Sequence, residues 1–257
     1  LFSKGSSNKS YGRFTRLKTI SIITPIPNMI NSIVEQSILH KAIDNDLVKF
    51  DVVDLREFGL GNYRQIDDTP YGGGGGMILM AEPLFAALDQ VINNLKNNDN
   101  TRIIYPSPQG QLWSHKKAIE NSNFDNLIFI CGHYKDIDQR VIDKYVTNEY
   151  SIGDYVVTNG EIPAMIMVDS IVRLIPGVLN NYDSVKTDSF YSGLELDAPY
   201  YTKPSEIDNL TVPNVLLSGN HEKINKWRMK ERRQRTKNKR PDVWSKRIDK
   251  LESLEDK

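Results

Sequence analysis

The chain has 257 residues, of which 39% are hydrophobic and 26% charged, and its 33 basic and 33 acidic side chains give a formal net charge of zero. These proportions are typical of a globular protein, and no apolar run approaches the roughly 18–20 residues that a membrane helix needs. A single cysteine, Cys131, excludes an internal disulfide and fits a reducing compartment, so we expect a cytoplasmic protein with no membrane span.

The first half of the chain alternates β-branched runs with amphipathic stretches. Residues 1–18 are polar and basic, and we expect them to form a disordered arm outside the fold. Residues 19–24, TISIIT, are predicted to form a strand that stops at Pro25 and Pro27. The segments that follow are a predicted helix at 29–45, a strand at 48–55 and a helix at 83–95.

The next part of the chain continues this alternation. The predicted elements are a strand at 102–105 cut off by PSPQG, a helix at 114–121, a strand at 127–131, a loop and short strand within 151–160, and a helix with Pro163 in its first turn. The strand LIFIC is apolar throughout, which is typical of a parallel strand buried on both faces. We therefore expect an α/β domain with a mostly parallel sheet. In such sheets ligands bind beyond the carboxyl ends of the strands, here at the loops 106–110 and 132–134.

The composition changes after this α/β domain, which we place at residues 19–179. Residues 180–201 are polar and broken, and we expect a flexible linker there. Residues 202–257 are expected to form a small helical domain. Its basic residues cluster in KINKWRMKERRQRTKNKR (223–240), which indicates either a polyanionic partner or the solvated face of a helix.

A run of five glycines occurs in YGGGGGM, residues 71–77. No lysine and hydroxyl residue follow it, as a phosphate-binding loop would require. The turn-forming residues before it do not resemble the strand that precedes a dinucleotide-binding loop. The run is therefore either a flexible turn or a loop whose backbone approaches a ligand closely.

Metal and thiol chemistry are not predicted. The four histidines, His40, His115, His133 and His221, show no ligand spacing, so we expect no metal site built on them. Cys131 ends a buried strand, and buried cysteines are usually inert packing residues.

Four blocks of sequence resemble one family, in the expected order along the chain. They are DDTPYGGGGGM (67–77), YPSPQG (105–110), ICGHYKDIDQRVIDKYVTNEYSIGDYVVTNGEIP (130–163) and LLSGNHEKINKWR (216–228). Together they resemble the bacterial tRNA guanine-N1 methyltransferases, which act on the guanosine just 3′ of the anticodon. The resemblance extends from about residue 18 to residue 240.

The resemblance implies a SPOUT-type methyltransferase, in which a parallel sheet carries a deep trefoil knot. Three knot loops would hold S-adenosylmethionine, and their glycines would let the backbone approach this cofactor. Carried over to this chain, the cofactor-binding residues are Tyr105, Pro106, Ser107, Pro108, Gly110, Gly132, His133, Tyr134, Ile152, Gly153, Tyr155, Val156, Val157, Asn159, Gly160 and Pro163.

The resemblance also implies the catalytic residues. Asp154, in the I-G-D-Y motif, is expected to remove the proton of guanine N1, and Arg140, in the D-x-R-V motif, to donate to guanine O6. The alternative for Arg140 is a surface salt bridge with a nearby carboxylate. Since the aspartate loop of this family comes from the partner subunit, we expect an obligate homodimer.

The expected partner is tRNA. The glycine run would face the RNA through Gly72, Gly73 and Gly74, and the basic segment would contact phosphates of the anticodon arm. Its expected substrate-binding residues are His221, Arg228, Arg232 and Arg233. Trp227 either stacks on RNA or, as we favour, packs in a core.

The chain departs from the family pattern at two places. Where the family usually has C-G-R-Y-E-G, this chain has CGHYKD, so Lys135 replaces a glutamate that the resemblance links to magnesium. Asp136 is available as a substitute from the next position, so the sequence allows magnesium without requiring it. At residues 24–27, TPIP replaces the common L-F-P-E.

Rival functions stay open. One is a SPOUT methyltransferase that acts on another RNA, and a second is a non-catalytic RNA-binding protein. A metabolic enzyme with a nucleotide cofactor is more distant, because the basic segment argues against it.

Overall fold

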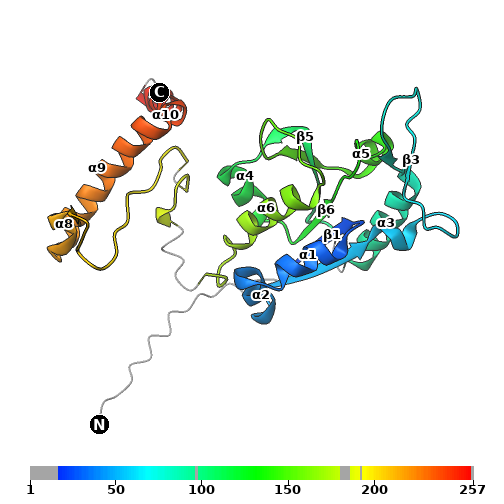
Figure 1. Cartoon of the computed structure of the whole chain (residues 1–257), viewed down its shortest axis with the longest axis horizontal. Coiled ribbons are helices and arrows are strands. Elements are labelled where there is room, and N and C mark those ends of the chain that lie inside the picture. The colour runs from blue at the N-terminus through cyan, green and yellow to red at the C-terminus, as the bar shows by residue number, and fades with distance from the viewer. Residues whose placement is uncertain (1–16, 96–97, 180–185, 192, 256–257) are drawn as a thin grey trace, which may run out of the picture. The chain divides into compact units, whose positions relative to one another are not determined.

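The computed structural model describes residues 17–95, 98–179, 186–191 and 193–255. Contacts between residues divide the chain into two compact units, Leu1–Asn180 and Asn181–Lys257. The first unit contains a parallel sheet with its helices, and the second contains the long basic helix (Figure 1).

A five-stranded sheet forms the centre of the first unit. In spatial order its strands are β2 (Val48–Asp54), β1 (Lys18–Thr24), β6 (Asn126–Ile130), β5 (Thr101–Leu112) and β7 (Asn148–Ser151), and every pairing between them is parallel. All residues of β6 are buried, as in a strand that is covered on both faces. The predicted α/β class with a mostly parallel sheet is confirmed. The strand pairing does not test the trefoil knot.

The helices of this unit form two groups (Figure 1). The first consists of α1 (Pro27–Val34), α2 (Ser37–Asp44), α4 (His115–Ser122) and α6 (Glu161–Val172), and the second of α3 (Ala81–Asn94) and α5 (Gln139–Tyr145). Apolar side chains of α3 and α5 pack with Ile128 and Ile130 of β6. The alternate residues Leu127 and Phe129 are equally buried and point to the opposite face of the sheet.

Several short elements were not predicted from the sequence. A 3₁₀ helix, η1 (Leu55–Phe58), follows β2. The two-residue strands β3 (Asp67–Asp68) and β4 (Ile78–Leu79) pair in antiparallel fashion on either side of the glycine run. The run therefore lies in the connection of a small hairpin, and the residues before it include a strand as well as a turn. Helix α5 was also missed, because it has only seven residues.

Three predicted boundaries are wrong. The single helix expected at 29–45 is two helices, because the chain breaks after Val34 and Ser37 takes a positive φ of 51°. The strand expected to stop at 105 continues to Leu112. Pro106 and Gln111 both pair with Tyr150, so the four residues between them bulge out of the sheet.

The strand expected within residues 151–160 lies earlier, at β7, and residues 152–159 are irregular. The expected disordered arm, 1–18, lies outside the described residues except at its end. There Lys18 is a buried member of β1 and donates from Nζ to the Phe124 carbonyl. Burial lowers the pKa of its ammonium group to about 8.

The second unit is mainly helical. Its elements are the hairpin β8 (Glu206–Ile207) and β9 (Leu210–Thr211), then α8 (Asn214–Leu217), α9 (His221–Lys239) and α10 (Pro241–Glu255). The hairpin was not predicted. Its turn residues Asp208 and Asn209 both have positive φ, a geometry that Asp and Asn tolerate. The side chain of Asn220 caps α9 by accepting from the Lys223 amide at 3.0 Å.

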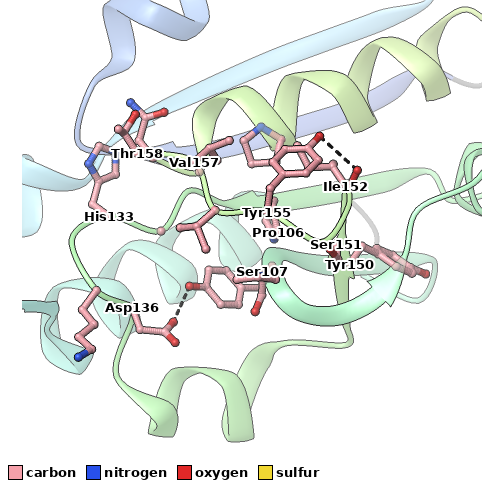
Figure 2. A pocket seen from close by; sticks show the side chains of 18 of the residues that line it. Pro106, Ser107, His133, Asp136, Tyr150, Ser151, Ile152, Tyr155, Val157 and Thr158 are labelled. Atoms are coloured by element: carbon pink, nitrogen blue, oxygen red, sulfur yellow. Dashed lines mark hydrogen bonds between the residues drawn. The ribbon is translucent and has the colours of Figure 1, made fainter.

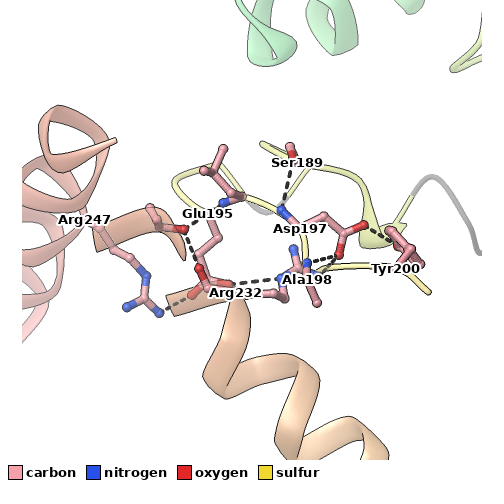
Figure 3. Close-up of polar contacts among 9 residues, drawn as sticks. Ser189, Glu195, Asp197, Ala198, Tyr200, Arg232 and Arg247 are labelled. Atoms are coloured by element: carbon pink, nitrogen blue, oxygen red, sulfur yellow. Dashed lines mark hydrogen bonds and ion pairs between the residues drawn. The ribbon is translucent and has the colours of Figure 1, made fainter. Parts of the chain in front are cut away.

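Part of the expected linker at 180–201 packs on α9 (Figure 3). Residues 180–185 and 192 lie outside the described residues. Within the remainder, the Leu196 amide donates to the buried Thr236 hydroxyl at 2.9 Å, and Glu195 pairs with Arg247 at 2.6 Å. This stretch is therefore a bound segment of the second unit.

Candidate functional site

A cavity lies at one edge of the sheet, where three chain segments meet (Figure 2). Strands β6, β5 and β7 are neighbours and run parallel, so their carboxyl ends share an edge. The cavity is lined by the bulge of β5, by the loop after β6, and by the irregular stretch between β7 and α6. It therefore lies where ligands bind in open parallel sheets.

Fifteen of the sixteen residues that the sequence assigns to the cofactor line this cavity: Tyr105, Pro106, Ser107, Pro108, Gly132, His133, Tyr134, Ile152, Gly153, Tyr155, Val156, Val157, Asn159, Gly160 and Pro163. The exception is Gly110, where a Cβ atom would lie 2.4 Å from backbone atoms of Glu149 and Tyr150. Gly110 thus seats the bulge against β7. Five lining residues were not predicted, although all of them lie within two positions of predicted ones: Lys135, Asp136, Tyr150, Ser151 and Thr158.

The loop after β6 and the start of α6 touch through two glycines. The Gly160 amide donates to the Gly132 carbonyl at 2.8 Å. A Cβ atom on Gly160 would lie 2.5 Å from the Gly132 nitrogen and 2.9 Å from the Cys131 Cα, which is closer than real side chains approach. Only glycine permits this contact, which closes one end of the cavity.

One buried acceptor in the cavity wall has no partner. Among the described atoms, the side-chain oxygen of Asn159 is buried and accepts no hydrogen bond. An unpaired buried acceptor is costly, so this oxygen is suited to receive an N–H group of a bound ligand.

A tyrosine and a carboxylate form the polar wall beside the β5 bulge. The Tyr105 hydroxyl donates to Asp136 at 2.6 Å, and the same carboxylate oxygen accepts from the Ile137 amide at 2.8 Å. Burial and the bond to Asp136 raise the pKa of the Tyr105 phenol above its ordinary value, so it stays neutral.

His133 is turned toward a buried carboxylate. Its Nε2 atom lies 2.8 and 2.9 Å from the two oxygens of Glu161, which has no exposed surface.

Burial and the charge of Glu161 raise the pKa of the Cys131 thiol, so it remains protonated and does not act as a nucleophile.

Arg140 lies in a different cavity of about 600 Å3, with Asp68 to Tyr71 and Asp138 in its lining. Its guanidinium forms two hydrogen bonds with Asp138, at 2.9 and 2.7 Å, and its side chain is 70% exposed. The salt bridge weighed as an alternative for Arg140 is therefore present within one chain. The guanidinium lowers the pKa of the Asp138 carboxyl through these bonds.

The described part of one chain does not bring the two predicted catalytic residues into one cavity. Asp154 is exposed and lines neither cavity described above. Beside it, Tyr155 and Val156 are 57% and 83% exposed. A catalytic pair of Asp154 and Arg140 would therefore need a second subunit or a rearrangement of the chain.

The glycine run takes a backbone conformation that other residues avoid. Gly72, Gly73 and Gly74 have φ values of 83°, 77° and 115°, and Gly76 has 95°. No atom lies within 4 Å of a Cβ placed at any of the first three. The glycines are thus required by the turn itself, and their open surroundings leave room for a ligand.

The basic residues of α9 divide between two faces. Arg232 is 14% exposed and lies 3.6 Å from Glu195 and 3.8 Å from Asp197 (Figure 3). It therefore binds a segment of its own unit. His221, Arg228 and Arg233 are exposed.

A groove of about 410 Å3 lies along the second face of α9, and Lys226, Met229, Lys230, Arg233, Gln234, Lys237 and Trp244 line it. Among the described side chains, Lys230, Arg233 and Lys237 have no acidic partner. Trp227, which was favoured as a core residue, is half-buried on α9 with its ring 6.4 Å from that of Tyr201.

Two absences hold for the part of the chain that the structure describes. No group of three or more His, Cys, Asp or Glu side chains in this part of the chain is arranged to hold a metal ion. None of its helices is both long and apolar enough to cross a membrane.

Ligands bind at the carboxyl edge of a parallel α/β sheet, and a basic helical unit favours a polyanionic partner. Together these features define the class of the protein as an enzyme that acts on a polyanion. The chain matches the sequence model of the family described as tRNA (Guanine-1)-methyltransferase TrmD over residues 18–246. The chain therefore belongs to this family, and the resemblance drawn from its four sequence blocks is confirmed.

Close relatives carry a corresponding name. Proteins of Staphylococcus aureus strains JH9, Newman and JH1, each named tRNA (guanine-N(1)-)-methyltransferase, are 47% identical to this chain over 224 residues. The aligned part covers 87% of this chain and 89% of each relative.

Proposed function

We propose that this protein transfers a methyl group from S-adenosylmethionine to N1 of the guanosine that follows the anticodon in tRNA. The observation that supports this most strongly is the meeting of three separate motif segments around one cavity, in a chain of this family. Since tRNA is the proposed substrate, we also propose a cytoplasmic location.

The cavity fits the proposed methyl donor chemically. Its wall combines backbone groups near Gly132 and Gly160, the unpaired Asn159 oxygen and the apolar side chains of Ile152 and Val157. The amide oxygen is suited to accept from an adenine amino group, and the apolar residues to cover the ring. When bound, the donor supplies a methyl group attached to positively charged sulfur. We also propose that the chain around this cavity forms the trefoil knot of SPOUT proteins. The close contact of the loop after β6 with the start of α6 supports this proposal.

In the proposed reaction, guanine N1 bonds to the methyl carbon while the carbon–sulfur bond breaks and its electron pair goes to sulfur. The N1 proton passes to the carboxylate of Asp154, which is exposed and able to reach a substrate. Arg140 donates to guanine O6, where negative charge accumulates as the proton leaves. Asp138 occupies Nε and Nη2 of this guanidinium, which leaves the N–H groups of Nη1 for the base.

We propose that the active enzyme is a homodimer in which these two residues come from different subunits. Within one chain Arg140 lines the cavity of about 600 Å3, while Asp154 lies outside it. The exposed apolar side chains of Tyr155 and Val156 beside Asp154 are suited to an interface. In the proposed dimer, the partner subunit covers these two side chains with the face that carries its own Arg140 cavity. Asp154 of one subunit then lies beside the Arg140 cavity of the other.

Magnesium has little support from the residues present. An ammonium group, Lys135, stands where the resemblance expects a glutamate, and Asp136 already accepts from Tyr105 and Ile137. The described residues thus do not fit a magnesium ion held by side chains of one chain, and no step above depends on it.

We propose that the second unit binds tRNA through the face of α9 that carries the groove. Lys226, Lys230, Arg233 and Lys237 recur every three or four residues, so they form one stripe along the helix. Trp244 adds an aromatic surface to the same groove. Arg232, by contrast, is held by Glu195 and Asp197 and serves the packing of the unit.

The proposed reaction is tested by methyl transfer to two tRNA transcripts that differ only at the position 3′ of the anticodon. The transcript with guanosine should accept one methyl group at N1, and the transcript with adenosine should accept none. Transfer to both transcripts, or only to an unrelated RNA, would support a different methyltransferase. RNA binding without any transfer would support the non-catalytic alternative.

The shared active site is tested by mixing two inactive variants, Asp154→Ala and Arg140→Ala. In a mixed dimer one site carries both substitutions and the other carries neither. With free subunit exchange at equal concentrations, about a quarter of the wild-type activity should return. If the mixture stays as inactive as its components although mass spectrometry detects mixed dimers, both residues act within one subunit.

The stripe on α9 is tested with Lys230→Ala/Lys237→Ala against Lys223→Ala/Lys239→Ala, two exposed lysines of the same helix outside the groove. The stripe variant should bind tRNA more weakly, and the slope of log affinity against log salt should fall by about 0.7–0.9 for each lost phosphate contact. Fluorescence anisotropy at several salt concentrations measures both quantities. Equal effects of the two variants would contradict a localised contact.

A further inference from the structure

The most deeply buried carboxylate beside the proposed donor cavity takes no part in the proposed reaction. Glu161 begins α6, has no exposed surface and does not line the cavity. Burying a carboxylate costs free energy unless hydrogen bonds and a counter-charge compensate it. Its partners therefore indicate what it does.

Glu161 joins three segments that are distant in the sequence. It accepts from the hydroxyl of Thr24, at the end of β1, and from His133, in the loop after β6. The Thr24 hydroxyl oxygen in turn accepts from the Ile26 amide at 2.9 Å, which fixes the direction of its own proton. The carboxylate thus connects β1, the loop after β6 and α6 at a single point.

One of these partners belongs to the wall of the cavity. His133 lines the cavity, and its side chain is 12% exposed. The next residue, Tyr134, has a positive φ of 60°, and the centroid of its ring lies 6.1 Å from that of the imidazole in an edge-to-face arrangement. The orientation of His133 therefore bears on the backbone of the loop that faces the donor.

We infer that Glu161 is a positioning residue that holds the loop of Gly132 to Tyr134 in its donor-binding form through His133. This inference rests on the proposed function, since it takes the cavity to be the donor site. Glu161 touches neither the donor nor the base, and it acts by keeping His133 and Thr24 in place. At both partner positions, His133 and Thr24, the sequence departs from the pattern that the resemblance implies.

The chemistry of the pair indicates which substitutions preserve it. His133 must present an N–H group to the carboxylate, and arginine has planar N–H donors that do the same. Phenylalanine has a similar ring but no donor, so His133→Phe leaves the buried carboxylate without its hydrogen bond from the ring. His133→Arg is the rescuing variant.

A second histidine–carboxylate pair provides the matched control. His40 Nε2 lies 3.5 Å from Asp44 on α2, where both side chains are at least half exposed. Because exposed pairs contribute little, His40→Phe should alter neither donor binding nor the loop.

The test compares wild type, His133→Phe, His133→Arg and His40→Phe in the full-length protein. Calorimetric titration with S-adenosylmethionine should show a dissociation constant raised roughly tenfold or more for His133→Phe and near wild type for the other two. In methyl-transfer assays the KM for the donor should rise while kcat and the KM for tRNA change little. A lower Tm for His133→Phe with unchanged donor affinity would overturn the inference in favour of a purely structural role.

Amide hydrogen exchange without any donor separates this inference from the proposed function. His133→Phe should speed exchange at residues 132–134 and 160, leave the amides of β1 and β6 slow, and be reversed by His133→Arg. Unchanged exchange in that loop would overturn the inference even if the enzyme methylates tRNA. If His133→Phe speeds exchange in that loop but the wild-type protein methylates no RNA, the positioning role stands and the proposed reaction is rejected.

Discussion

The proposed donor site depends on the contact of two backbones at which no side chain fits. Gly160, at the start of α6, lies against Gly132, at the beginning of the loop after β6, with a hydrogen bond of 2.8 Å between them. A single added carbon on Gly160 would overlap the Gly132 nitrogen at 2.5 Å. Because atoms cannot overlap, this contact fixes how near the two loops come, and with it the width of the cavity that both line.

The sheet supplies the frame for this contact. Parallel order brings the carboxyl ends of β6, β5 and β7 to one edge, and the irregular segments after them close around the same space. Near the glycine contact, the buried Glu161 carboxylate binds His133 and Thr24, so polar and steric constraints act on the same loop. In the second unit, the basic residues of the long helix α9 divide between two roles. Arg232 is neutralised inside the unit, while the stripe with Lys230 and Lys237 remains available to a polyanion.

Much of the fold and of the lining of the cavity could be predicted from the sequence. The apolar run of β6 predicts a parallel strand buried on both faces, and the motif segments predict nearly all of the cavity lining. The continuation of β5 beyond Pro106 could not be predicted, because it depends on pairing with Tyr150, a partner over forty residues away. The helix break before Ser37 is likewise decided by a local positive φ that no periodicity records.

The sequence was least informative where neighbouring positions carry the same chemistry. Almost every residue of α9 around Arg232 is polar or basic, so the helix has no apolar stripe to show which face is inward. Arg232 and Arg233 therefore look equivalent in the sequence, although one binds Glu195 and the other lines a groove. The placement of Asp154 relative to Arg140 is a different case. In the proposed dimer the two residues come from different subunits, so their contact requires a second copy of the chain.

The most direct measurement of the central claim is the donor affinity of Gly160→Ala compared with that of Gly75→Ala, a glycine whose φ is not positive and whose Cβ would meet no atom within 4 Å. Calorimetric titration with S-adenosylmethionine, on protein shown to be folded by circular dichroism, should give wild-type affinity for Gly75→Ala and at least a tenfold loss for Gly160→Ala. Wild-type affinity in a folded Gly160→Ala variant would contradict the account, since the cavity would then not depend on the contact of the two backbones.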